Sequence, residues 1–114
     1  MARDDGELVP GTFEMLLLKA LSLGAMHGWG IAERIERLSD GVCAVQQGAV
    51  YPVLQRLLRR GWIVAEWRAS DNNRRARYYR LTNSGKKQLA AEVIWWKRAI
   101  GGVDRVLRSA AQES

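Results

Sequence analysis

The sequence predicts a mainly α-helical fold with one small β-hairpin, in the order helix, helix, helix, hairpin, helix. Apolar residues recur at helical spacing in three segments before residue 61, the period changes to two between residues 62 and 82, and a heptad pattern follows. This order is that of a winged helix-turn-helix, with the hairpin as the wing, followed by a C-terminal dimerisation helix. The 114 residues suit one structural unit, in which residues 1–82 form the winged part and residues 83–110 the last helix.

Each of the first three predicted helices has an apolar stripe and a stop signal. The first runs from Gly11 to Gly24, the second covers residues 27–38 before the turn at 39–41, and the third covers residues 47–60. Pro52 is tolerated in the third helix because N–H groups near a helix start lack intrahelical acceptors. The stripes are Phe13, Leu16, Leu17, Ala20 and Leu21, then Trp29, Ile31, Ile35 and Leu38, then Val50, Val53, Leu54, Leu57 and Leu58.

Two segments rich in β-branched and aromatic residues, 62–67 and 77–82, predict paired strands joined by a polar hairpin tip at 70–75. Thr82, Asn83 or Ser84 is expected to cap the last helix. Its apolar residues are alternately four and three positions apart, which is an a/d seam: Leu89, Val93, Trp96, Ile100, Val103 and Leu107. Gly101 and Gly102 each weaken this helix by roughly 1 kcal/mol relative to alanine, so a bend there is the alternative to a continuous helix.

Composition excludes several classes of protein. With one cysteine, Cys43, and one histidine, His27, the chain has no disulfide framework and too few such ligands for a zinc site, so we expect no metal and no cofactor. We expect His27 to cap or pack a helix start, and Cys43 to be a small buried hydrophobe. The sequence has no apolar run long enough to cross a membrane and no signal-like start, which predicts a cytoplasmic protein.

The positive charge is concentrated in one segment. The net charge is +6, and residues 56–80 hold eight arginines and two acidic residues. Such a patch suggests a polyanionic partner such as double-stranded DNA, although an arginine-rich solvated face has the same composition.

A helix-turn-helix places its second helix in the major groove, and here that helix is residues 47–60. Gln46, Gln47 and Tyr51 are the expected readers, because glutamine pairs with adenine edges and tyrosine donates to phosphate or packs on thymine. The alternative for Tyr51 is a half-buried position under the wing. Gln55 shares this polar face, and Arg56 is expected to meet phosphate.

The wing supplies a second set of expected DNA contacts. Arginines so close together at a hairpin tip favour binding to the phosphate backbone or an adjacent minor groove over a merely solvated turn. The residues are Asn73, Arg74, Arg75 and Arg77.

The seam of the last helix predicts a homodimer, because the small domain cannot cover the whole stripe and an exposed stripe favours aggregation. Two-fold pairing separates the recognition helices by roughly 34 Å, which predicts an inverted-repeat operator. The adjacent Trp95 and Trp96 could sandwich a small, flat aromatic effector across the dimer, and plain interface packing is the alternative.

Five strings resemble the PadR-type regulators in their order and spacing: Leu8-Val9-Pro10-Gly11-Thr12, His27-Gly28-Trp29-Gly30-Ile31, Val50-Tyr51-Pro52-Val53-Leu54, Gly61-Trp62-Ile63 and Tyr78-Tyr79-Arg80-Leu81-Thr82. The resemblance covers nearly the whole chain. It implies a winged-helix domain, a single C-terminal dimerisation helix as in the short subclass, and repression relieved by a small molecule. It also implies DNA contacts by Tyr51, Gln47, Gly48 and the basic residues of 74–77.

The sequence thus favours a sequence-specific DNA-binding repressor that acts as a homodimer. A winged-helix module that binds RNA or protein is the second hypothesis, because this fold serves several roles. An enzyme ranks last, since no carboxylate pair, activated nucleophile, metal cluster or phosphate-binding glycine loop can be assembled from these residues.

Overall fold

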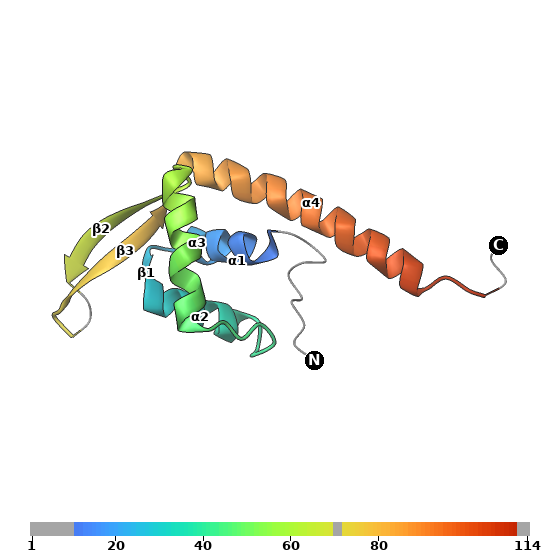
Figure 1. The fold of residues 1–114 in the computed structure, drawn as a ribbon, viewed down its shortest axis with the longest axis horizontal. Coiled ribbons are helices and arrows are strands. Elements are labelled where there is room, and N and C mark those ends of the chain that lie inside the picture. The colour runs from blue at the N-terminus through green and yellow to red at the C-terminus, as the bar shows by residue number, and fades with distance from the viewer. Residues whose placement is uncertain (1–10, 70–71, 112–114) are drawn as a thin grey trace.

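The computed structural model describes residues 11–69 and 72–111. In chain order the elements are α1 (Thr12–Ser22), β1 (Met26–His27), α2 (Gly28–Leu38), α3 (Gln47–Arg59), β2 (Ile63–Ala69), β3 (Arg75–Leu81) and α4 (Asn83–Leu107). Figure 1 shows α1, α2 and α3 packed together, with the β2–β3 hairpin and α4 extending from them. The predicted winged helix-turn-helix with a C-terminal helix is confirmed. Residues 8–10 of the family strings and residues 70–71 of the hairpin tip lie outside the described residues.

The core lies where the three short helices meet the sheet. Its fully buried side chains are Leu17, Leu18, Ile31, Val50, Leu54, Leu57 and Ile63. Two polar side chains add to this packing: Glu14 of α1 forms ion pairs with Arg56 and Arg60, and Arg34 of α2 donates to the carbonyls of Ala20 and Gly24. The stripe of α3 is the expected one except that Leu58 is only partly buried. In α1 the helix buries Met15 and Leu18, which the pattern does not include, while Phe13 and Leu16 are only partly buried.

The stripe predicted for α2 is wrong at both ends, where Trp29 is 57% exposed and Leu38 is 55% exposed. Trp29 lies two positions before Ile31, and residues two apart point to different faces of a helix. Leu38 lies in the last turn. Cys43, expected to be buried, is partly buried and packs against the core.

The sheet has three antiparallel strands in the order β1-β3-β2. Strand β1 pairs Met26 with Tyr79 and His27 with Tyr78. It has only two residues, so no periodic pattern in the sequence could predict it. Pairing in the hairpin extends to Ala69 and Arg75, so both strands reach further toward the tip than expected. Arg75 and Arg77 are consequently strand residues of β3, whereas the sequence pattern predicts them at the tip.

The junction between the hairpin and α4 is closely packed. The Thr82 side chain accepts a hydrogen bond from the Gly85 amide at 3.0 Å and donates one to the Gly61 carbonyl at 2.8 Å, which confirms Thr82 as a cap. A Cβ atom on Gly85 would overlap the backbone carbonyl oxygen of Trp62. Only glycine therefore fits at this position in the first turn of α4.

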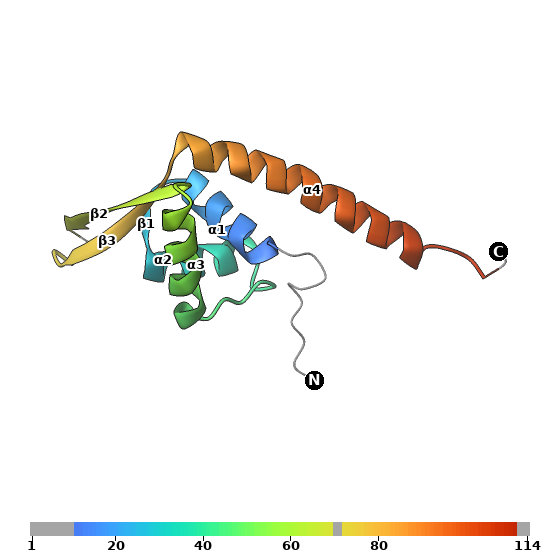
Figure 2. The same cartoon turned by 45° about the horizontal axis from the view of Figure 1, so that its top comes forward.

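Helix α4 is continuous through Gly101 and Gly102, so the predicted alternative of a bend does not occur. Figures 1 and 2 both show its C-terminal half projecting beyond the other helices, at the opposite end of the molecule from the hairpin tip. The longest dimension of the molecule is 63 Å as a result. Within residues 11–69 and 72–111, the helices lack the combination of length and hydrophobicity needed to cross a membrane.

We expect Gly85→Ala to lower the free energy of unfolding by about 1–3 kcal/mol, because the added methyl group forces α4 away from the Trp62 carbonyl. Gly101→Ala is the matched control on the same helix, where the nearest neighbour of a new Cβ is an Arg105 guanidinium nitrogen at 3.9 Å. That change should stabilise the helix by up to about 1 kcal/mol. Urea unfolding at one protein concentration measures both, and equal effects would contradict the proposed packing.

Candidate nucleic-acid interface

Helices α2 and α3 form the helix-turn-helix, and α3 presents one face to the core and one to solvent. Val50, Val53, Leu54 and Leu57 are buried, whereas Tyr51 and Gln55 are exposed on the other side. The polar face predicted for this helix therefore lies at the molecular surface.

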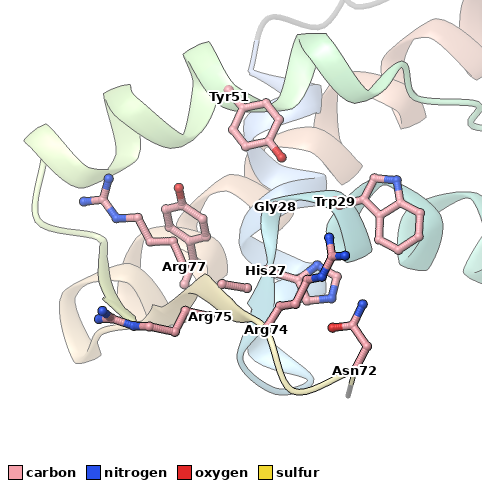
Figure 3. A pocket seen from close by; sticks show the side chains of 10 residues that line it. His27, Gly28, Trp29, Tyr51, Asn72, Arg74, Arg75 and Arg77 are labelled. Carbon is pink, nitrogen blue, oxygen red and sulfur yellow. The ribbon is translucent and has the colours of Figure 1, made fainter. Parts of the chain in front are cut away.

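A hollow of about 460 Å³ lies between the start of α2, the first half of α3 and the wing (Figure 3). Three arginines and four rings line it, and none of the described residues at its wall is acidic. The lining residues are His27, Gly28, Trp29, Tyr51, Asn72, Arg74, Arg75, Ala76, Arg77 and Tyr79. The hollow therefore combines positive charge with flat apolar surfaces.

Tyr51 stands over Gly28, which has no side chain to exclude it. A Cβ atom on Gly28 would lie 2.8 Å from Cε1 of Tyr51, closer than such atoms normally approach. Figure 3 shows the Tyr51 ring pointing from α3 toward Gly28. The side chain is 46% exposed, so it is held against α2 and still open to a ligand.

His27 fixes the start of α2. Its Nδ1 atom accepts a hydrogen bond from the Gly30 amide at 2.9 Å, and this confirms the predicted capping role. The imidazole stacks on Trp29 with 5.9 Å between centroids and meets Tyr78 edge-on at 5.3 Å. The sequence pattern assigns Trp29 to the apolar stripe of its helix and gives no sign that it borders this hollow.

The wing arginines differ in direction. Figure 3 shows Arg74 reaching toward His27 and Trp29, whereas Arg75 points away. Arg75 lies over the Trp67 ring at 5.3 Å, and Arg77 lies over the Tyr79 ring at 5.9 Å. Burial raises the pKa of the Tyr79 hydroxyl, and the positive charge of Arg77 opposes this shift.

Four other arginines of residues 56–80 are paired with carboxylates. Arg56 and Arg60 bind Glu14 at 3.0 and 3.1 Å, while Arg68 and Arg80 lie 2.9 and 3.8 Å from Glu66. The hydrogen bond from Arg68 and the charges of both arginines lower the pKa of Glu66. The positive charge at the hollow is consequently that of Arg74, Arg75 and Arg77.

The residues predicted to read DNA are placed unevenly. Gln46, Gly48 and Gln55 lie on α3 or just before it, outside the buried face, and Asn73 is exposed at the hairpin tip. Gln47 differs, because its Nε2 atom donates to the Trp29 carbonyl at 3.2 Å and its Oε1 atom is buried. Arg56 is also engaged within the protein, by Glu14, and is not among the residues that line the hollow.

The predicted seam divides along α4. Leu89 packs against the core of its own chain, while Leu107 is 77% exposed at the far end. Val93, Trp96, Ile100 and Val103 are partly exposed. Trp95 is 56% exposed and lies outside the seam.

Comparison with known proteins identifies the family. The model of the transcriptional regulator PadR-like family matches residues 17–91. The chain is similar to a PadR family transcriptional regulator from Eggerthella lenta, with 27% identity and a TM-score of 0.74; the match covers 91% of this chain and 88% of the other. It also resembles a PadR-like transcriptional regulator from Bacillus cereus, with 22% identity and a TM-score of 0.77 over 91% of this chain and 99% of the other.

A third similar structure is that of Bacillus subtilis PadR in complex with operator DNA. Its identity is 23% and its TM-score 0.64, over 73% of this chain and 47% of the other, so this likeness concerns the fold. Because the family model covers more than half of the sequence, this chain belongs to the PadR-like family of transcriptional regulators.

Proposed function

We propose that this protein is a repressor that binds double-stranded operator DNA as a homodimer. The observation that carries the proposal is the hollow between α3 and the wing, where three arginines and no acidic side chain stand among the described lining residues. A regulator of this kind acts where chromosomal DNA is, so we place it in the cytoplasm.

In this proposal α3 enters the major groove and the wing follows the backbone. Gln46 and Gln55 face base edges, Gly48 allows a close approach, and the Tyr51 hydroxyl donates to a phosphate. Gln47 acts by holding α3 against α2, since its amide is bonded to the Trp29 carbonyl. Arg74, Arg75 and Arg77, with Asn73, bind phosphates or the adjacent minor groove, and Arg56 reaches phosphate only by leaving Glu14.

The proposed interface predicts a defined salt dependence. Arg74→Ala should weaken operator binding and reduce the slope of log affinity against log salt by about 0.9 for each phosphate that is no longer neutralised, hence by about 1.8 per dimer. Tyr51→Ala should weaken binding through the removal of a neutral donor and should leave the slope nearly unchanged. Fluorescence anisotropy with a labelled duplex from the protein's own promoter region measures both.

Arg98→Ala is the control for Arg74→Ala, because it removes one positive charge from α4, away from the hollow. It should leave affinity and slope close to wild type. Unchanged binding by Arg74→Ala and Tyr51→Ala would refute the assigned DNA face. Equal wild-type affinity for promoter and unrelated duplexes at every salt concentration would instead favour the RNA- or protein-interaction module.

We propose pairing through the exposed part of the α4 seam. Trp96, Ile100, Val103 and Leu107 follow one another at spacings of four and three on a helix that projects past its own domain (Figure 2). A second copy related by two-fold symmetry would cover this stripe and place two α3 helices on one face, which suits an inverted-repeat operator.

Leu107→Asp should convert the dimer to a monomer without unfolding the domain, because Leu107 is 77% exposed within one chain. Ile94→Asp is the matched control, as Ile94 is 64% exposed on α4 but lies off the seam. Sedimentation velocity distinguishes the two variants. A wild-type protein that sediments as a monomer, with and without duplex, would contradict the proposed dimer.

The proposed effector is a small, flat aromatic molecule bound at Trp95 and Trp96. Trp96 lies on the seam, where it would meet the partner, and Trp95 is exposed beside it. Large aromatic surfaces at an interface suit flat apolar ligands. We expect anilinonaphthalene sulfonate to bind the wild-type protein in a fluorescence titration, to lose affinity with Trp96→Ala and to retain it with Trp67→Ala. Failure of the wild-type protein to bind it would count against this site.

A further inference from the structure

We infer that Trp29 is a DNA-contacting residue whose indole packs against a deoxyribose of the strand held by the wing. This inference rests on the proposed function, because it concerns the same hollow. It adds an apolar contact from α2 to the polar contacts assigned to α3 and the wing. Its effect is on affinity for any duplex, since every deoxyribose presents the same apolar surface.

Trp29 is not part of the hydrophobic core of its own chain. The buried face of α2 is formed by Ile31, Ala32 and Ile35, and Trp29 lies off that face with 57% of its surface exposed. Single exposed aromatic side chains are common on protein surfaces, and what distinguishes Trp29 is its place in the lining of the hollow. The seam of α4 does not cover it, because the projecting half of α4 lies at the opposite end of the molecule from the wing (Figure 1).

The Trp29 ring nonetheless has an aromatic neighbour that limits its freedom. It stacks on His27 at an interplanar angle of 19°, and His27 is fixed by its hydrogen bond to the Gly30 amide and by the edge of Tyr78. The Trp29 carbonyl is held in turn by the Gln47 side chain. An exposed ring that is already ordered loses little conformational entropy when a partner binds it.

The neighbours of Trp29 indicate what that partner is. Figure 3 shows the indole beside the guanidinium of Arg74, with Tyr51 on the other side of the hollow. The site therefore places an apolar flat surface next to a cation, with a hydroxyl donor across the hollow. A DNA backbone alternates apolar deoxyribose with anionic phosphate, which matches an apolar ring with a cation beside it. The faces of the bases in a duplex are stacked on one another, so the sugar is the apolar surface that every nucleotide offers to the indole whatever its base.

The first test compares variants in anisotropy titrations with the promoter duplex and an unrelated duplex. Trp29→Ala should lower affinity for both duplexes by the same factor, about tenfold in all for the loss of one aromatic contact in each protomer of the dimer. The slope against log salt should stay as in the wild type, because every phosphate neutralised by the wild type is still neutralised. Trp29→Phe should keep most of the affinity, since it retains a flat ring.

Leu38→Ala is the control, because it removes an apolar side chain of similar exposure, 55%, from the other end of α2. It should bind both duplexes as the wild type does. A drop in the affinity of Trp29→Ala that is accompanied by a smaller salt slope would mean that Trp29 acts through the wing arginines, and this would overturn the direct contact.

The second test observes the ring itself in the unmutated protein. With 5-fluorotryptophan incorporated, the ¹⁹F resonance of Trp29 is assigned from its absence in Trp29→Phe, and that of Trp95 from Trp95→Phe. Adding either duplex should shift the Trp29 resonance and leave that of Trp95 in place. Wild-type DNA binding with an unmoved Trp29 resonance would overturn the inference alone, whereas no binding to any duplex would overturn the proposed function as well.

Discussion

The rest of the structure depends on the junction where the hairpin closes and α4 begins. Thr82 is bonded there to Gly61 and Gly85 through its side chain, and its amide donates to the Trp62 carbonyl at 3.0 Å. Gly85 packs so closely on that carbonyl that no side chain fits. Because β2 starts, β3 ends and α4 begins within this junction, a single set of contacts fixes the directions of the wing and of the last helix.

A second constraint shapes the hollow, and it is again a close approach at glycine. Gly28 allows the Tyr51 ring to lie against the start of α2, and the cap formed by His27 positions Trp29 beside it. These contacts order large side chains without burying them. Ordered and accessible groups are suited to binding, because the entropy of arranging them is lost on folding and not on association. The charges are arranged in the same way. Glu14 and Glu66 neutralise four arginines that do not line the hollow. The positive potential is therefore strongest at the wing arginines that do line it.

Much of the fold could be predicted because its helices have long amphipathic patterns, and the seam of α4 is visible for the same reason. The sequence could not predict the pairing of Arg56 with Glu14, which lies 42 positions away and approaches only after α1 and α3 have packed. Nor could it reveal β1, because two residues have no measurable period. The sequence pattern wrongly assigns Trp29 to the apolar stripe, because a hydrophobic side chain suggests a core position. Its angular position on α2 instead places it at the surface.

The division of α4 separates what holds the domain together from what is proposed to hold two copies together. Leu89 belongs to the core of its own chain, whereas Leu107 is exposed and has no role in that core. The winged part can therefore stay folded when the distal seam is disrupted. If two copies pair there, binding of one α3 to a half-site makes binding of the second α3 intramolecular, and the affinity for a full operator rises without any new DNA contact. The close packing at Thr82 and Gly85 limits how far α4 can rotate relative to the wing. The gain in affinity should therefore depend on the spacing between the two half-sites.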